Sequence, residues 1–391
     1  MYAVLSQRLP LDINSTTYIP LPPGQVEKEQ EQISNHICVC MSIGDGIETI
    51  RGIAASEPIL SEAASLIMSD CKSFHLADVL AEVLSGFGIN PGDRAELLVS
   101  AFFTWARDKT VSARHDPQCP GQLSRYFSVT DLFSSLFSES TYASMSRAIP
   151  SLCPPNSKFK RQTFEKTFSN ALMHYNHFIK AHEQKVLKRP HLLAFMARGA
   201  AAFGANCQPG FDILYPFLFG GDTVLSVKKL GLAISQIKKN DLKSRKARAR
   251  VFKKMDPYAC GLLDLDHIDE DDLFPILIIR IVFALCSDEP GVTIQAYSSP
   301  LEGASYLDCN GHPRFISYDF WCLGVNPDIL QPVKEAPDRW TALANKADSW
   351  KDFYNTPLDP GLLRSLNPGA AHDHHHFDSW SAPIPGFEDI F

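Results

Sequence analysis

The sequence predicts an α/β fold, in which a central mixed sheet packs against helices and an N-terminal helical layer precedes it. Residues 213–219 and 230–238 are two apolar runs separated by a Gly-Gly-Asp turn signal, a pattern typical of consecutive strands. Residues 274–286 form one continuous apolar run, as expected of a strand buried on both faces. Residues 43–110 instead repeat apolar residues at three- and four-residue steps, which indicates helices.

Length, charge and cysteine usage restrict the classes of protein that fit. The chain has 391 residues, of which 45% are hydrophobic, so it can bury a large core in one elaborated domain or two. The net charge of −7 means that any surface for nucleic acid has to be local. We find no signal-peptide pattern, no apolar run long enough to span a bilayer, and no Cys-x-x-Cys pair among ten cysteines. We therefore expect an intracellular protein of the nucleus or cytoplasm, with reduced thiols and no membrane association.

We expect four segments along the chain. Residues 1–42 are polar and rich in Pro, Gln and Glu, which is typical of a mobile arm. Residues 43–160 form a helical N-terminal region, residues 161–325 the α/β core, and residues 326–391 a C-terminal extension and tail.

The core should contain alternating helices and strands. Only the ten residues 220–229 separate the first two strands, too few for a parallel crossover, so we expect antiparallel neighbours. Pro216 lies inside the first strand, where proline is confined to edges and bulges. The expected order is a helix at 161–187, a helix from 190, strands 213–219 and 230–238, a basic helix, and strands 274–286, 292–297 and 315–322.

Three polar residues stand at the ends of the two consecutive strands. Asp212 directly precedes the first strand, while Gln236 and Lys238 end the second and, two residues apart, share one face. Mg²⁺ accepts oxygen ligands, here Asp212, the Gln236 side chain and the Ile237 carbonyl, and the Lys238 ammonium would hold a phosphate or the attacking water. In the alternative interpretation Asp212 caps a turn after Gly210, and Gln236 and Lys238 simply end a strand at the surface.

An acid on one strand and Gln-x-Lys on the next resemble the metal-binding core of the PD-(D/E)xK nucleases, the restriction-endonuclease-like superfamily. The resemblance implies an αβββαβ core, Mg²⁺ or Mn²⁺, and catalytic roles for Asp212, Gln236 and Lys238, the first two as metal ligands. The sequence departs from the family at Gln236, where an acid is usual, so the metal shell loses one negative charge. Either another carboxylate compensates or the site is weak or inactive; the candidates are Glu96, Glu183 and Asp222.

Glu96 has two interpretations. Asp93 and Glu96 have the spacing of a capping box, in which the glutamate bonds back to the first amide of its helix. In the functional interpretation Glu96 is the helix-borne acid that often supplements a PD-(D/E)xK site, and it would then be catalytic.

Longer stretches resemble a large, mostly uncharacterised family that has expanded in fungal genomes. The likeness covers most of residues 50–370 and implies membership rather than an activity. The stretches that carry it are ILSEAASLIM, GDRAELLVSAFFTWARDK, LLAFMARGAAAFGANCQPGFDILYPFLF, ISQIKK, MDPYACGLLDLD and YDFWCLGVNP.

The strongest charge signal follows the second strand. Nine Lys or Arg residues lie within 238–254, against a single Asp. Clustered cations release counterions when they bind a nucleic-acid backbone, so a helix here would track phosphates beside the hairpin. A solvated helix face or a nuclear-import signal is the alternative. The candidate contacts are Lys239, Lys243, Arg245, Lys246, Arg248, Arg250, Lys253 and Lys254.

Three hypotheses of function remain open. The first is a metal-dependent nuclease, and the second is a catalytically inactive relative that binds nucleic acid or protein through the same fold. The third is an interaction protein whose helical N-terminal half binds a partner, in which case the basic run should point away from the hairpin. The sequence identifies no protein partner and no oligomeric state.

Overall fold

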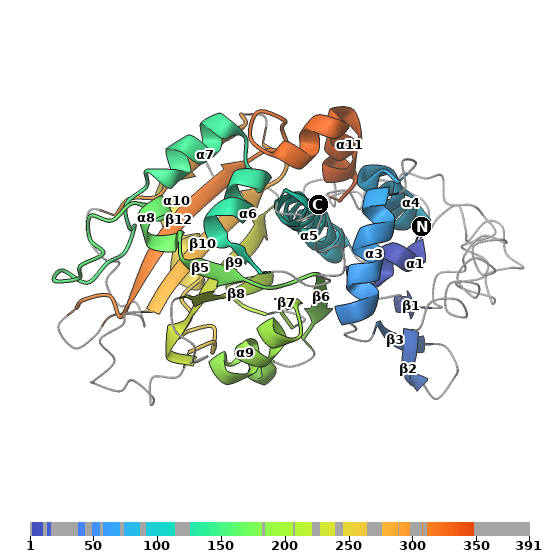
Figure 1. Ribbon diagram of the computed structural model, residues 1–391, viewed down its shortest axis with the longest axis horizontal. Helices are drawn as coiled ribbons and strands as arrows, with labels where there is room; N and C mark the ends of the chain where they lie inside the picture. Colours follow the sequence, from blue (N-terminus) through green and yellow to red (C-terminus); the bar gives the residue numbers. More distant parts are fainter. Residues whose placement is uncertain are drawn as a thin grey trace, which may run out of the picture.

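The computed structural model describes part of the chain, and within this part a nine-stranded mixed sheet is covered by helices on both faces (Figure 1). A three-stranded sheet lies beside the N-terminal helices. The α/β fold class predicted from the sequence is confirmed. The described residues are 2–10, 14–16, 38–43, 49–54, 58–70, 74–86, 91–113, 126–181, 184–205, 208–220, 227–238, 245–263, 276–287, 289–297, 307 and 311–347.

The large sheet has the strand order β11-β12-β10-β9-β8-β5-β4, with β7 paired to β8 and β6 paired to β7. Its strands are β4 (Phe127–Ser128), β5 (Ala171–Met173), β6 (His177–Lys180), β7 (Ala200–Phe203), β8 (Ile213–Phe219), β9 (Leu230–Lys238), β10 (Ile276–Ala284), β11 (Gly291–Ile294) and β12 (Phe315–Leu323). The small sheet consists of β1 (Asn14–Thr16), β2 (Cys38–Ile43) and β3 (Thr49–Ala54).

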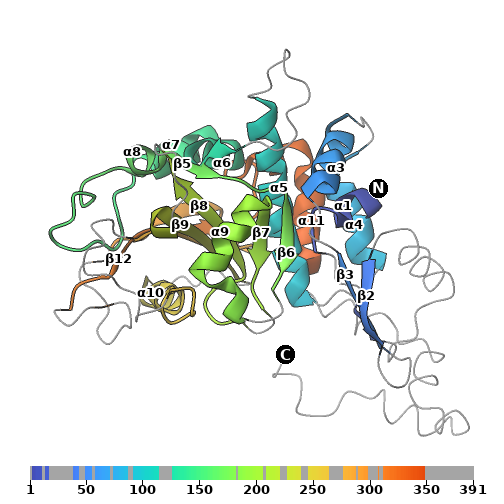
Figure 2. The same cartoon turned by 60° about the horizontal axis from the view of Figure 1, so that its bottom comes forward.

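Two helical layers cover the large sheet, because successive residues of a strand point to opposite faces. Tyr215 and Ala233 belong to the apolar cluster shared with α5, α6 and α8, whereas Leu214 and Ile234 belong to the cluster under α9 and α10. Figure 2 shows the two layers on either side of the strands. The helices are α1 (Tyr2–Ser6), α3 (Pro58–Asp70), α4 (Leu76–Gly86), α5 (Pro91–Ser112), α6 (Val129–Leu136), α7 (Glu139–Ser146), α8 (Phe164–Phe168), α9 (Arg189–Ala197), α10 (Arg245–Lys254) and α11 (Pro337–Ala347).

The predicted hairpin is present with the predicted boundaries. β8 and β9 are adjacent and antiparallel, and β10 then returns parallel to β9 after α10, as a β-α-β crossover. Pro216 lies where the second neighbour of β8 changes, because β7 pairs with Ile213 and Leu214 and β5 pairs only from Phe217 onward. The missing amide proton of Pro216 therefore interrupts no ladder on that side.

The expected helix at 161–187 is wrong. That stretch forms the short helix α8, then β5 and β6. The aromatic spacing that indicated one helix belongs to α8 only as far as Phe168; beyond it the fully buried residues alternate, as at Ala171, Met173 and Tyr175. Similarly, the helix expected from 190 is shorter than predicted: α9 ends at Ala197, Gly199 adopts a φ of 66°, and β7 begins at the next residue.

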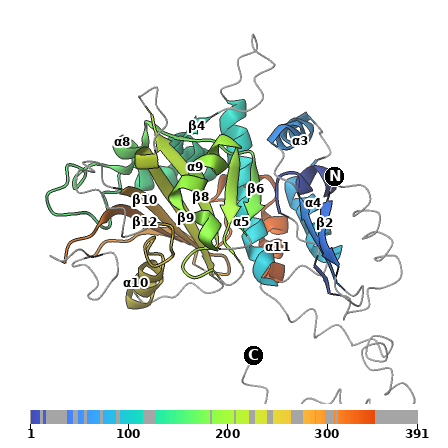
Figure 3. The same cartoon turned by 90° about the horizontal axis from the view of Figure 1, so that it is seen from below.

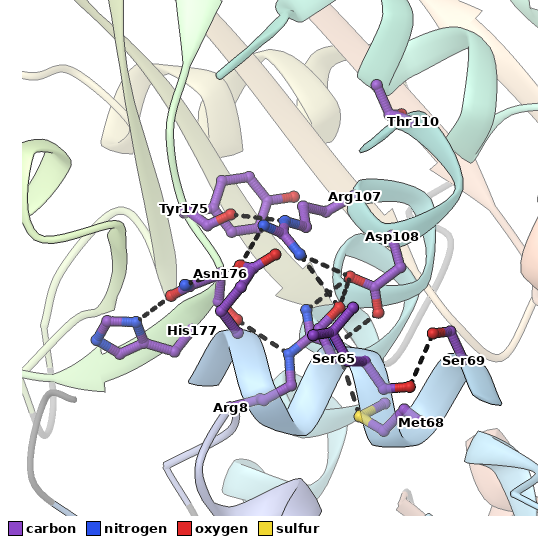
Figure 4. Close-up of polar contacts among 12 residues, drawn as sticks. Arg8, Ser65, Met68, Ser69, Arg107, Asp108, Thr110, Tyr175, Asn176 and His177 are labelled. Carbon is purple, nitrogen blue, oxygen red and sulfur yellow. Dashed lines mark hydrogen bonds and ion pairs between the residues drawn. The ribbon is translucent and has the colours of Figure 1, made fainter. Parts of the chain in front are cut away.

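The first ten residues also differ from the expected mobile arm. They form α1, and Leu5 and Leu9 are fully buried. Arg8 donates from Nη2 to Asp108 Oδ1 at 2.8 Å and from Nε to the Asn176 carbonyl at 3.0 Å (Figure 4). The N-terminus is therefore tied to α5 and to the start of β6.

Arg107 of α5 continues this polar network. Its guanidinium lies 2.7 Å from Glu62 and 3.1 Å from Asp108, and its Nε donates to the Tyr175 carbonyl. Two arginines and two carboxylates thus neutralise one another between the helical layer and the sheet, which indicates a structural role. Helix α5 begins at Pro91, before Asp93, so the capping-box interpretation of Asp93 and Glu96 is wrong.

A buried ion pair fixes α10 on the sheet. Arg280 of β10 and Asp319 of β12 are register partners, joined from Nε to Oδ1 at 2.7 Å and from Nη2 to Oδ2 at 2.5 Å. Arg280 Nη1 also donates to the Phe252 carbonyl of α10 at 2.7 Å. Carbonyls in the last turn of a helix lack partners within the helix, so Arg280 ties the end of α10 to the strands.

We predict that Arg280→Met lowers the free energy of unfolding by about 3–5 kcal/mol, because Asp319 stays buried and charged without its partner. Replacing both residues with apolar ones should recover much of that loss, as measured by chemical denaturation. The control is Arg339→Ala, which removes an exposed ion pair with Asp78 and should cost less than about 1 kcal/mol. A loss for Arg280→Met as small as in the control would contradict the role of the buried pair.

Candidate functional site

Asp212, Gln236 and Lys238 meet at one end of the hairpin. Ile213 pairs with Ser235 in the antiparallel register of β8 and β9, which sets Asp212 opposite Gln236. Opposite residues of neighbouring strands share a face, and Lys238 follows on the same face two residues later. The structure therefore brings together the three hairpin residues that the sequence predicts.

This face is the one that α9 and α10 cover. Leu214 and Ile234, which alternate in phase with Asp212 and Gln236, pack in the apolar cluster that contains Phe252 of α10. Seen from below, α9 lies in front of β8 and β9 with α10 beside it (Figure 3). The candidate site thus lies on the side of the sheet that carries the basic helix.

Gly210 allows α10 to lie close to the site. Its φ of 90° is in the left-handed region, and a Cβ at this position would lie 2.2 Å from the Lys254 carbonyl oxygen and 2.4 Å from Cys260 Sγ. A side chain therefore does not fit, and the end of α10 packs directly on the chain two residues before Asp212.

Asp212 is a half-buried acid with a perturbed pKa. Its Oδ2 accepts a hydrogen bond from the Ile237 amide at 2.5 Å, and its own amide donates to the Ser235 carbonyl at 2.8 Å. Burial raises the pKa of Asp212 to about 6, against the opposing effects of the Ile237 amide and the Lys238 charge. A raised pKa in a carboxylate that faces polar neighbours is typical of functional sites.

Gln236 supplies an oxygen that lacks a partner. Its side chain is 7% exposed, and Oε1 is buried with no hydrogen-bond partner among the residues that the structure describes. Such an atom costs free energy unless something binds it. A hard divalent ion held between Gln236 Oε1 and the Asp212 carboxylate would satisfy both groups, so these residues fit a Mg²⁺ or Mn²⁺ ion.

The structure brings none of the three candidate acids of the sequence to the side of Asp212 within the described residues. Within the described part of the chain, no three His, Cys, Asp or Glu side chains gather at metal-binding distance. Glu96 is half-buried on α5, a helix that packs through Phe103 and Tyr215 on the face of the sheet opposite to Asp212. Glu183 and Asp222 lie outside the described residues.

The basic run divides into two kinds of side chain. Arg248 donates to Thr293 Oγ1 at 3.3 Å and lies over the Trp321 ring at 5.5 Å, so it helps to hold α10 on the sheet. Arg250, Lys253 and Lys254 are exposed. Lys239 and Lys243 lie outside the described residues, and so do the side chains of Arg245 and Lys246.

Asp212→Asn should stabilise the protein above pH 6 and not near pH 4. The folded chain keeps the Asp212 proton up to about pH 6, whereas the unfolded chain releases it near 3.8, so folding stability falls as pH rises through this window. Asparagine carries no charge, and the variant should gain roughly 1–3 kcal/mol at pH 8 in urea denaturation. Asp328→Asn, at an exposed loop position, is the control; an equal gain at both pH values would contradict the buried charge.

Nothing in the described helices combines the length and apolar character that a bilayer span requires. Cys153, Cys260, Cys286 and Cys322 are free thiols.

Comparisons with known proteins returned no match for this chain. No protein-family model matches it, and neither does any curated protein or solved structure in the searches. The family resemblances of the sequence therefore stay predictions, and a function has to be inferred from the hairpin and α10 themselves.

Proposed function

We propose that this protein is a metal-dependent phosphodiesterase of the nuclease type that acts on nucleic acid. One observation carries the proposal: Asp212 and Gln236 face each other on adjacent strands, with Lys238 on the same face and the end of α10 packed beside them. Carboxylate, amide oxygen and ammonium on one face are the groups that phosphodiester hydrolysis needs.

The roles of the residues follow from their chemistry. Asp212 provides the charged ligand, and Gln236 Oε1 provides a neutral one. Lys238 holds a phosphate oxygen or the attacking water. A bound Mg²⁺ or Mn²⁺ would polarise the phosphoryl oxygen and lower the pKa of the attacking water. Ion and proton compete for Asp212, so metal affinity should fall as pH drops below about 6.

The second candidate is a catalytically inactive module that binds nucleic acid on the same face. The replacement of the usual acid by Gln236 favours it, because an ion with one carboxylate is held weakly. An interaction protein that works through its N-terminal half receives less support, since α10 packs beside the hairpin instead of pointing away from it.

Cleavage and its dependence on metal distinguish the first two candidates. Asp212→Asn should abolish cleavage of single- and double-stranded substrates with Mg²⁺ or Mn²⁺, because it removes the one carboxylate among the described residues of the hairpin. Lys238→Ala should lower the rate with little effect on metal affinity, while Gln236→Glu should tighten magnesium binding through its added charge. A wild type without cleavage, together with a Gln236→Glu variant that gains none, would leave the inactive module in place.

Binding to nucleic acid should depend on the exposed cations of α10. Changing Arg250, Lys253 and Lys254 to Glu should weaken binding to duplex DNA and flatten its salt dependence, by roughly 0.9 in the log–log slope for each lost phosphate contact. The charge-matched control changes Lys160, Arg161 and Lys166, which are exposed near α8 on the far side of the sheet. Equal losses in the two triple variants would show that only net charge matters.

A further inference from the structure

Asp212 has a neighbour on each side within the sheet. The β7–β8 register pairs Phe203 with Ile213, which sets Gly204 opposite Asp212, and the Gly204 amide donates to the Asp212 carbonyl at 2.8 Å. Gln236 lies opposite Asp212 on the β9 side. One row across the sheet therefore reads Gly204, Asp212, Gln236, and its side chains share the face that α9 and α10 cover.

Gln208 fills the place of the side chain that Gly204 lacks. A Cβ built on Gly204 would lie 3.0 Å from both Cβ and Cγ of Gln208. Because that Cβ would point to the same face as Asp212, Cβ and Cγ of Gln208 lie on the face of the sheet that carries Asp212. In the row of the sheet that contains Asp212, Gln236 thus stands on the β9 side and the stem of the Gln208 side chain on the β7 side.

The side chains of Gln208 and Gln236 both contain buried polar atoms without a hydrogen-bond partner in the described part of the chain. Gln208 Oε1 and Nε2 are both buried without a hydrogen-bond partner among the described residues, as is Gln236 Oε1. Leaving one such atom unpaired costs roughly 1–3 kcal/mol, and cores normally avoid it. Three of these atoms on the face of the sheet that carries the half-buried Asp212 point to a ligand that supplies their partners.

We propose that Gln208 is a further residue of this site, which binds a divalent ion through Oε1 as a second neutral ligand. The inference rests on the proposed function, because it assumes the ion that Asp212 and Gln236 would hold. Its Nε2 then remains a donor for a phosphate oxygen of the substrate. Gly204 contributes to the same arrangement, since a Cβ at this position would crowd the Gln208 side chain.

Direct metal binding tests this assignment without a need for activity. Mn²⁺ binding is measured by calorimetry at pH 8, without nucleic acid, for the wild type and for Gln208→Glu, Gln236→Glu and Gln162→Glu. Gln208→Glu and Gln236→Glu should each tighten binding on the order of tenfold, because each adds a charged ligand beside Asp212. Gln162 bonds to the Lys158 carbonyl near α8 and serves as the charge-matched control without a gain.

The outcomes separate the two proposals. Tightening by Gln236→Glu but not by Gln208→Glu overturns the role of Gln208 and leaves the proposed function standing. No tightening by either variant overturns the ion site itself. If Gln208→Glu does not fold, Gln208→Leu is measured in the Gln236→Glu background, where loss of a ligand should weaken Mn²⁺ binding severalfold; unchanged affinity there overturns the assignment of Gln208.

Discussion

The buried pair between Arg280 and Asp319 determines where the basic helix lies. The two side chains are almost fully inaccessible, so their charges are stabilised only by each other and by neighbouring hydrogen-bonding groups. Arg280 also donates a hydrogen bond to the Phe252 carbonyl, and this bond places the end of α10 over β10 and β12. Without it α10 would be held by its apolar contacts and by Arg248. Packing of Lys254 against Gly210 then follows from the same placement.

The hairpin end combines a destabilised carboxylate with an amide oxygen that is unpaired among the described residues. Most polar groups in the interior are satisfied, as in the network of Arg8, Arg107 and Asp108 that closes on itself. At Asp212 and Gln236 burial instead opposes the charge of the acid and leaves an oxygen unpaired. Proteins retain such destabilising groups mainly at functional sites, where a bound ion or substrate provides their partners.

The parts of this fold that depend on local pattern could be predicted from the sequence. β8 and β9 have the predicted bounds because turn signals and apolar runs delimit them, and a ten-residue connection requires antiparallel pairing. The stretch 161–187 was misjudged because apolar residues in short strands coincided with helical spacing. The contacts of Arg8 span 100 and 168 residues, and the position of Gln208 depends on the register of Gly204. Neither leaves a local trace in the sequence, since both arise only from tertiary pairing.

A site with this charge count would behave differently from one built on two acids. Asp212 contributes one negative charge and Lys238 cancels it, while Gln208 and Gln236 are neutral, so an ion gains little electrostatic stabilisation from the protein alone. A nucleic-acid phosphate held beside α10 would provide the missing anionic ligands, because Mg²⁺ commonly completes its shell with substrate oxygens. Ion and substrate would then each increase the affinity for the other by the same factor, as linkage requires. In such a site the cations of α10 do more than attract the backbone, since they bring the oxygens that the ion lacks.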